Sequence, residues 1–194
     1  MDFNKVRARQ QKNREPRYGI SLVHMPGAEP LSRIAAWMDE LDTHYGNIFI
    51  RYPVPHLSIA RCRSVPEPFE VRDISLLRAL RIRQEKTLSI NADIGTDGVL
   101  RLRFSDISLE GITDVASFYQ SNNLRYDLIT TPWMSLGLAN IQHPDIAARV
   151  NLLEADLADS LFPHLELRMN MLSAVYYENI LLEKHNLILQ IPLV

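Results

Sequence analysis

His56 and Ser58 stand two residues apart in the stretch PHLSIA at residues 55–60. Side chains alternate between the two faces of a strand, so an imidazole and a hydroxyl at this spacing share one face. Leu57 and Ile59 then point to the opposite face, toward a core. An imidazole exchanges protons near neutral pH, and a hydroxyl donates hydrogen bonds to a charged oxygen. The stretch therefore predicts a proton-transfer group beside a hydrogen-bond donor.

A second stretch, PWMSLG at residues 132–137, repeats this pattern with one difference. Proline, serine and the apolar positions recur, but Trp133 occupies the position that corresponds to His56, 77 residues further on. Around each copy the sequence favours strand, helix, motif strand and helix, which is typical of an internal duplication. We expect the two motif strands side by side at a pseudo-twofold axis, with their polar side chains lining one groove.

Hydrophobic periodicity and turn residues predict the elements that position these side chains. Proline favours the first turn of a helix, and Ser or Thr favours the position just before it. The expected elements are, in chain order, a strand at 18–23, a helix from Pro30 to Gly46, a strand at 48–52, the first motif strand, a helix at 69–82, a hairpin of strands at 88–94 and 100–104, a short helix capped by Thr113 that includes Val115, Phe118 and Tyr119, the second motif strand, a helix from Pro144 to Leu161, and two or three strands in 165–194 around a turn near Glu183-Lys184.

Length and composition indicate one soluble globular unit. The chain has 194 residues, of which 46% are hydrophobic and 23% charged, and its formal net charge of -2 gives no global attraction to a DNA duplex or an anionic membrane. We expect a single bilobal domain over residues 18–194, a monomer, and a basic arm over residues 1–17 that is exposed or forms a short helix. The single cysteine, Cys62, excludes a disulfide framework and fits a reducing, cytoplasmic location.

Arginine dominates the basic residues, with 17 Arg among the 21 Lys and Arg. Nine of them lie between Arg51 and Arg103, where there are only six acidic residues. A guanidinium matches the geometry of a phosphate group and binds it through two hydrogen bonds. Solvated strand and helix faces would account for the same pattern. Arg61, close to Ser58 on the first motif strand, is the arginine we consider for ligand binding.

The paired motifs resemble those of the two-histidine (2H) phosphoesterases, the superfamily with the LigT-like, or RNA ligase/cyclic phosphodiesterase, fold. That superfamily has one His-x-Ser/Thr-x motif in each of two lobes. The resemblance begins near Tyr18 and extends to residues 172–175 and 183–193, which are similar to the closing hairpin of that fold. It implies an α+β fold of two pseudo-symmetric lobes, each an antiparallel sheet with helices outside, around a central groove.

The resemblance also implies a chemistry, the metal-free cleavage of 2′,3′-cyclic or 2′-5′ phosphodiester bonds in RNA ends or small nucleotides. One histidine acts as general base, the other acts as general acid, and the two hydroxyls hold phosphate oxygens. Carried over to this sequence, the catalytic residues are His56, Ser58 and Ser135. Trp133 cannot act as an acid or base, because an indole N–H donates a hydrogen bond without exchanging its proton near neutral pH.

Each positioned acid or base typically contributes roughly 10²–10⁴-fold to a rate, so the change at Trp133 predicts impaired catalysis. We therefore expect a 2′,3′-cyclic phosphodiesterase-like protein that acts on or binds RNA ends or small nucleotides, without metal or cofactor. Trp133 would stack on a base and Arg61 would contact the ligand. The alternative is a non-catalytic nucleotide-binding or protein-interaction scaffold that kept the fold.

Two further side chains are candidates for chemistry. His24 follows the first strand and is either a structural histidine or a replacement for the missing acid. Cys62 is four residues past Ser58 and even-spaced from His56, so it is either a core or rim thiol or a nucleophile on the same face. No pair of histidines has the spacing of metal ligands.

Overall fold

The computed structural model describes residues 1–63, 65, 83–84, 90–104, 109–110, 114–129, 133–158 and 170–192. The expected helix at 69–82, the Thr113 cap and Leu161 lie outside these residues. The elements are α1 (Phe3–Arg14), β1 (Gly19–His24), α2 (Ala28–Tyr45), β2 (Phe49–Arg51), β3 (Leu57–Arg63), β4 (Arg83–Gln84), β5 (Ile90–Ile94), β6 (Val99–Phe104), β7 (Leu109–Glu110), α4 (Asp114–Ser121), β8 (Asp127–Leu128), β9 (Trp133–Ala139), α5 (Ile146–Ala158), β10 (Met171–Tyr177) and β11 (His185–Pro192).

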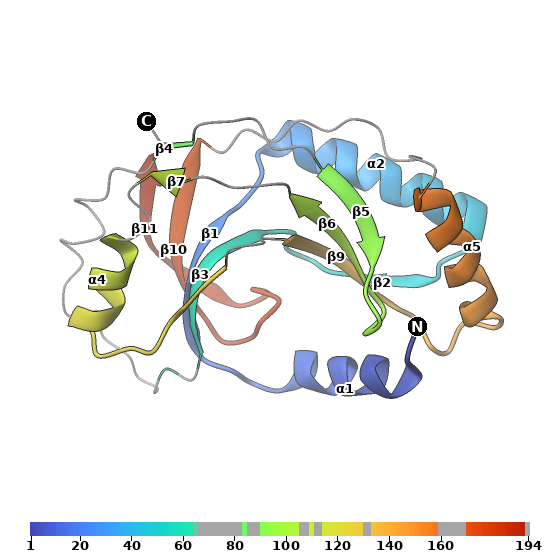
Figure 1. Cartoon of the computed structure of the whole chain (residues 1–194), viewed down its shortest axis with the longest axis horizontal. Helices are drawn as coiled ribbons and strands as arrows, with labels where there is room; N and C mark the ends of the chain where they lie inside the picture. Colours follow the sequence, from blue (N-terminus) through green and yellow to red (C-terminus); the bar gives the residue numbers. More distant parts are fainter. Residues whose placement is uncertain are drawn as a thin grey trace.

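The protein is an α+β structure built on one large antiparallel sheet (Figure 1). In the part of the chain that the structure describes, the strand order is β11-β10-β1-β3-β9-β6-β5, with β2 added to β9 and β8 added to β3. The two motif strands, β3 and β9, are neighbours at the centre of the sheet, as the duplicated pattern predicted. The expected hairpins are present as β5 with β6 and β10 with β11.

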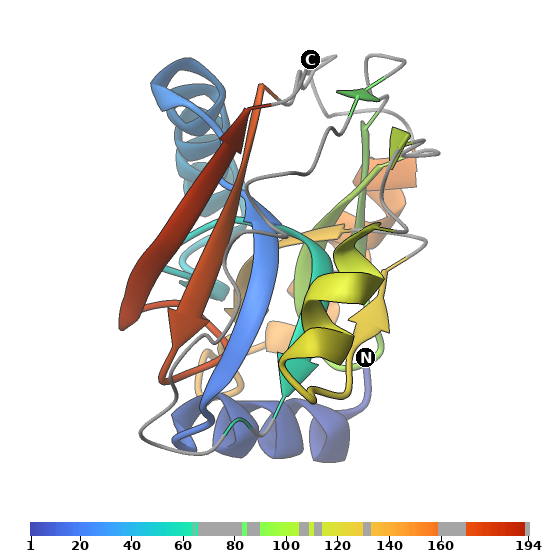
Figure 2. The same ribbon diagram turned by 90° about the vertical axis from the view of Figure 1, so that its left-hand side faces the viewer.

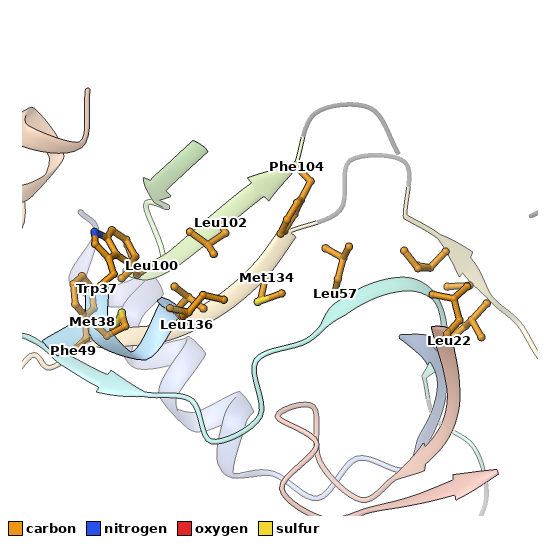
Figure 3. Close-up of a cluster of buried hydrophobic side chains, with 14 of the residues drawn as sticks. Leu22, Trp37, Met38, Phe49, Leu57, Leu100, Leu102, Phe104, Met134 and Leu136 are labelled. Carbon is orange, nitrogen blue, oxygen red and sulfur yellow. The ribbon is translucent and has the colours of Figure 1, made fainter. Parts of the chain in front are cut away.

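One face of the sheet carries the main hydrophobic core, which includes side chains of α2, α4 and α5. Leu57 of β3 and Met134 of β9 are fully buried in it, at the middle of the sheet (Figure 3). Helix α2 contributes four buried side chains at helical spacing, which are Ile34, Trp37, Met38 and Leu41. The helix ends at Gly46, whose φ of 76° favours glycine, so the predicted end of this helix is confirmed.

The opposite face of the sheet is covered in part by α1, which runs below β3 and β9 (Figures 1 and 2). Asp2 caps this helix by accepting hydrogen bonds from the backbone N–H groups of Asn4 and Lys5. Val6 is fully buried in a second, small cluster with Tyr52, Val99 and Leu138. Of the two forms expected for residues 1–17, the structure therefore shows the helix, and it is packed against the sheet.

The packing of α1 depends on a glycine. Gly98 has a φ of 72°, and a Cβ built on it would lie 2.7 Å from Cγ2 of Val6. Only a residue without a side chain lets the helix approach the sheet this closely, and the left-handed backbone favours the same residue.

The strand pairing itself repeats after 77 residues, the spacing between the two sequence motifs. Strand β2 pairs with β9 so that Ile50 is opposite Leu138 and Arg51 opposite Gly137. Strand β8 pairs with β3 so that Asp127 is opposite Arg61 and Leu128 opposite Ala60. Adding 77 to the two β2 residues gives the two β8 residues, and subtracting 77 from their β9 partners gives the β3 partners.

Each motif strand also contains a β-bulge at the corresponding position. In β3, Ser58 and Ala60 pair with consecutive residues of β1, so Ile59 is the extra residue. In β9, Ser135 and Gly137 pair with consecutive residues of β6, so Leu136 is the extra residue. A bulge leaves one residue unpaired and changes which face the following side chains occupy.

Candidate functional site

The candidate site residues meet in one cavity of about 110 Å³ on the sheet face covered by α1. Each water molecule needs roughly 10–15 Å³ of such cavity volume, so the cavity has room for several waters or a small anion. It is lined by side chains of α1, the motif strands and the turns beside them, which are Arg9, Lys12, Ser21, Tyr52, Val54, His56, Ser58, Arg61, Ile129, Trp133, Ser135, Tyr177, Ile180, Leu181 and Leu182.

The polar side chains of both motifs reach this cavity because of the alternation along each strand. His56 and Ser58 are half-buried, whereas Leu57 and Ile59 are buried in the core, as predicted. On β9, Trp133 and Ser135 are half-buried, whereas Met134 and Leu136 are buried. All five residues singled out from the sequence therefore line the same space, with Arg61 as the fifth.

Arg61 reaches the cavity because of the bulge at Ile59. Strict alternation from Ser58 would place Arg61 on the core face and Cys62 on the cavity face. The extra residue reverses this, so Cys62 is 2% exposed in the main core and is not on the face of His56. Burial also raises the pKa of the Cys62 thiol, with a smaller contribution from the charge of Asp127, so the nucleophile alternative is wrong.

The two motifs face each other across the β3–β9 pair. Leu57 is directly opposite Met134 in an antiparallel register. Continued by one residue in each direction, this register places His56 across from Ser135 and Ser58 across from Trp133. Each hydroxyl thus lies near the imidazole or indole of the other motif, and the four side chains form one side of the cavity.

His56 is held in a form that suits a general base. Its Nδ1 lies 2.8 Å from the Val54 carbonyl oxygen, and because a carbonyl only accepts, Nδ1 carries the hydrogen. The neutral ring is then left with Nε2 as the nitrogen that accepts a proton. Burial lowers the pKa of His56, the Val54 hydrogen bond acts in the opposite direction, and the nearby charges of His185 and Arg61 lower it further.

Trp133 is positioned by a cation–π contact. The guanidinium carbon of Arg101 lies 5.7 Å from the centre of the indole ring. Arg101 is itself fixed by two hydrogen bonds to the carboxylate of Asp97, at 2.7 and 2.6 Å. Arg101 therefore lies over one face of the indole ring.

Three cationic side chains line the cavity. Arg9 and Lys12 of α1 join Arg61 of β3 in lining it, and no Asp or Glu occurs among the described residues that do so. The Nε of Arg9 is buried without a hydrogen-bond partner. A partly buried space with three cations and two hydroxyl donors favours an anion with several acceptor oxygens.

The sequence did not identify Arg9, Lys12, Tyr52 or Tyr177 as parts of the site. The basic composition of residues 1–17 indicated that this segment could carry cations such as Arg9 and Lys12 to an anion. It could not show where the helix packs. His24, the alternative for the missing acid, is 1% exposed and its Nδ1 lies 3.0 Å from the Met171 carbonyl. It does not line the cavity, so it is a structural histidine of the β1–β10 pair.

Nothing in the described ranges has the composition of a metal centre, since no three His, Cys, Asp or Glu side chains are grouped to hold an ion. In the same ranges, no helix is long and apolar enough to cross a membrane. Comparison of the chain with protein-family models gave no match, and comparison with curated proteins gave none either.

The two half-buried or buried histidines predict acid sensitivity. Burial lowers the pKa of both His24 and His56 below the ordinary value of 6.5, so the unfolded chain binds protons that the folded protein does not. Their contribution to stability is complete above pH 6.5 and is lost as pH falls below it. We expect the free energy of unfolding, measured by urea titration, to decrease from pH 7 to pH 5.

The replacement His24→Gln tests which histidine causes that loss. It removes a buried group that resists protonation, so the decrease between pH 7 and pH 5 should become smaller. His143→Gln, at a half-buried histidine just before α5 that hydrogen-bonds at the surface, is the matched control and should leave the pH dependence intact. An unchanged pH dependence in His24→Gln would contradict this assignment.

Proposed function

We propose that this protein binds the phosphate of a nucleotide or RNA end in the cavity between the motif strands and α1, as a 2′,3′-cyclic phosphodiesterase-like protein with impaired catalysis. The observation that carries the proposal is the cavity itself, where His56, Ser58 and Ser135 meet beside cationic side chains and no described acidic one. Ser58 and Ser135 would donate hydrogen bonds to two phosphate oxygens, and Arg61 would neutralise their charge.

The repeated strand pairing supports a two-lobed fold of the 2H kind. The registers of β2 with β9 and β8 with β3, and the bulges at Ile59 and Leu136, all repeat after 77 residues. A chance resemblance of two short motifs would not extend to the pairing partners and bulges around them. We infer that the two halves arose by internal duplication and meet at the Leu57–Met134 pair.

The chemistry available in the cavity is half of that needed for hydrolysis. When water attacks the phosphorus of a cyclic diester, His56 Nε2 can take the proton of the attacking oxygen. As the phosphorus–oxygen bond to the leaving group breaks, the leaving oxygen needs a proton from an acid on the side of the phosphorus opposite His56. In the duplicated motif this is the position of Trp133, which has no proton to give. Turnover is therefore expected near background, with ligand binding retained.

Binding is testable by titration calorimetry with 2′,3′-cyclic nucleotides and nucleoside 2′-phosphates. The wild-type protein should bind at least one of them, with an affinity that falls as salt screens the cationic side chains. Ser58→Ala and Ser135→Ala should each weaken binding by about tenfold, the low end for a hydrogen bond to a charged group. Ser32→Ala, at an exposed serine of α2, is the matched control and should have no effect.

Two results of this titration would contradict the proposal. One is the absence of heat and of any thermal shift with every ligand. The other is binding that Ser58→Ala and Ser135→Ala leave unchanged. Either result would favour the alternative in which the fold serves as a scaffold for a protein partner.

A further inference from the structure

The N-terminal helix α1 forms part of the candidate site and lies along the lower edge of the molecule in Figure 1, beneath the sheet. At its start, the Asp2 backbone N–H donates to the Thr96 carbonyl in the β5–β6 turn, at 2.9 Å. Beyond its end, the Arg17 N–H donates to the Glu178 carbonyl after β10, at 2.8 Å. The helix is therefore attached on both sides of the β3–β9 pair, and the cavity lies between it and the motif strands.

Two contacts fix the orientation of the helix between these attachments. Val6 is fully buried against the sheet, and Asn13 Nδ2 donates a hydrogen bond to the Tyr52 hydroxyl at 2.9 Å. Tyr52 lines the cavity, so Asn13 joins the helix directly to the site. Arg9 and Lys12 lie between Val6 and Asn13, one turn apart, and both line the cavity.

The cationic side chains that line the cavity outnumber the single negative charge of a cyclic phosphate. A 2′,3′-cyclic phosphodiester carries one negative charge, and the proposed function assigns it to Arg61 and the two serine hydroxyls. Arg9 and Lys12 add two positive charges from the helix side of the cavity. The buried Nε of Arg9 has no hydrogen-bond partner, so this donor would be satisfied by an acceptor on a ligand.

We propose that Arg9 and Lys12 bind a second anionic group, so that the ligand carries a 5′-phosphoryl group in addition to the 2′,3′-cyclic phosphate. This inference rests on the proposed function, which assigns the cyclic phosphate to Ser58 and Ser135. The 5′-phosphoryl group is either a terminal phosphate on a mononucleotide or the phosphodiester that links the last nucleotide of an RNA. Helix α1 is then a ligand-binding element of the site.

Calorimetry with three ligands tests the inference, using adenosine 2′,3′-cyclic phosphate, its 5′-phosphorylated form, and the dinucleotide that ends in the same cyclic phosphate. Wild-type protein should bind the 5′-phosphorylated form at least about tenfold more tightly than the unphosphorylated one, as expected for charge-assisted hydrogen bonds. Tighter binding of the mononucleotide than of the dinucleotide identifies the terminal phosphate, and the reverse order identifies an RNA end.

The double substitution Arg9→Gln with Lys12→Gln should abolish this preference, so that the 5′-phosphorylated form binds no more tightly than adenosine 2′,3′-cyclic phosphate. The matched control removes Arg7 and Arg14, two exposed arginines of the same helix, by the same change to Gln and should keep the preference. Ser58→Ala should weaken all three ligands alike, because it acts on the cyclic phosphate that they share.

The outcomes separate this inference from the proposed function. Binding of all three ligands that depends on Ser58 but shows no preference for a 5′-phosphoryl group overturns the role of α1 alone. Failure of the wild-type protein to bind any of the three overturns both. A preference that survives the double substitution also overturns the role of Arg9 and Lys12.

Hydrogen exchange provides a measurement that does not depend on the variants folding normally. In wild-type protein, saturating 5′-phosphorylated ligand should slow exchange of the α1 backbone amides more than saturating adenosine 2′,3′-cyclic phosphate does. Equal protection of α1 by the two ligands would contradict the contact of the helix with the second group.

Discussion

Replacing Trp133 by histidine is expected to raise hydrolysis of 2′,3′-cyclic nucleotides at least tenfold above the wild-type rate. That is a modest share of the roughly 10²–10⁴-fold that one positioned acid or base contributes. The reason is the register of the motif strands, in which position 133 corresponds to His56 and lies across from Ser58. An imidazole there would supply the proton that the leaving oxygen needs.

The control for this gain is His56→Ala in the Trp133→His background, which should return hydrolysis to the wild-type level. Release of product is measured by chromatography, and binding of the cyclic nucleotide is measured on the same samples. Trp37→His, at the other tryptophan, which lies in the main core, should give no hydrolysis. A folded Trp133→His protein that binds the nucleotide and does not hydrolyse it would show that the site lacks more than one histidine.

The smaller side chain has a structural cost that the experiment must record. Trp133 is half-buried and contacts the guanidinium of Arg101. Its replacement removes this cation–π contact and leaves the hydrogen bonds of Arg101 to Asp97 in place. We expect a loss of stability well below that of a fully buried aromatic residue, about 1–2 kcal/mol, because water can enter the open side. A melting curve for the variant distinguishes lost folding from lost chemistry.

The Leu57→Ala replacement is expected to reduce the free energy of unfolding by about 3–5 kcal/mol, a large share of the stability of a domain of this size. Leu57 is fully buried at the centre of the sheet, where β3 pairs with β9, and it packs in the main core (Figure 3). Truncation leaves a cavity that the sheet, paired on both sides, cannot close. Urea unfolding measures the change.

Leu187→Ala is the matched control for this prediction. Leu187 is on β11 and is 54% exposed, so the same truncation should change the free energy of unfolding by less than about 1 kcal/mol. Met134→Ala, at the corresponding position of the second motif, should resemble Leu57→Ala, because Met134 is equally buried. A loss below about 1.5 kcal/mol for Leu57→Ala would contradict the central position of this pair in the core.

The local elements followed from the sequence because their signals are local. Periodic apolar residues defined α2 and α5, turn residues defined the β5–β6 hairpin, and Gly46 marked the end of α2. The repeated motif also predicted that β3 and β9 are neighbours, and the pairing of Leu57 with Met134 confirms this. Alternation along each motif strand was sufficient to place His56, Ser58, Trp133 and Ser135 on one face.

The tertiary structure decided two features that alternation and composition do not determine. The bulge at Ile59 turns Arg61 into the cavity and Cys62 into the core, and a bulge depends on the pairing with β1 that forms only in the folded sheet. The position of α1 depends on the burial of Val6 against Gly98, residues 92 positions apart. The sequence determined that residues 1–17 are basic, but only long-range packing placed Arg9 and Lys12 opposite the motif strands.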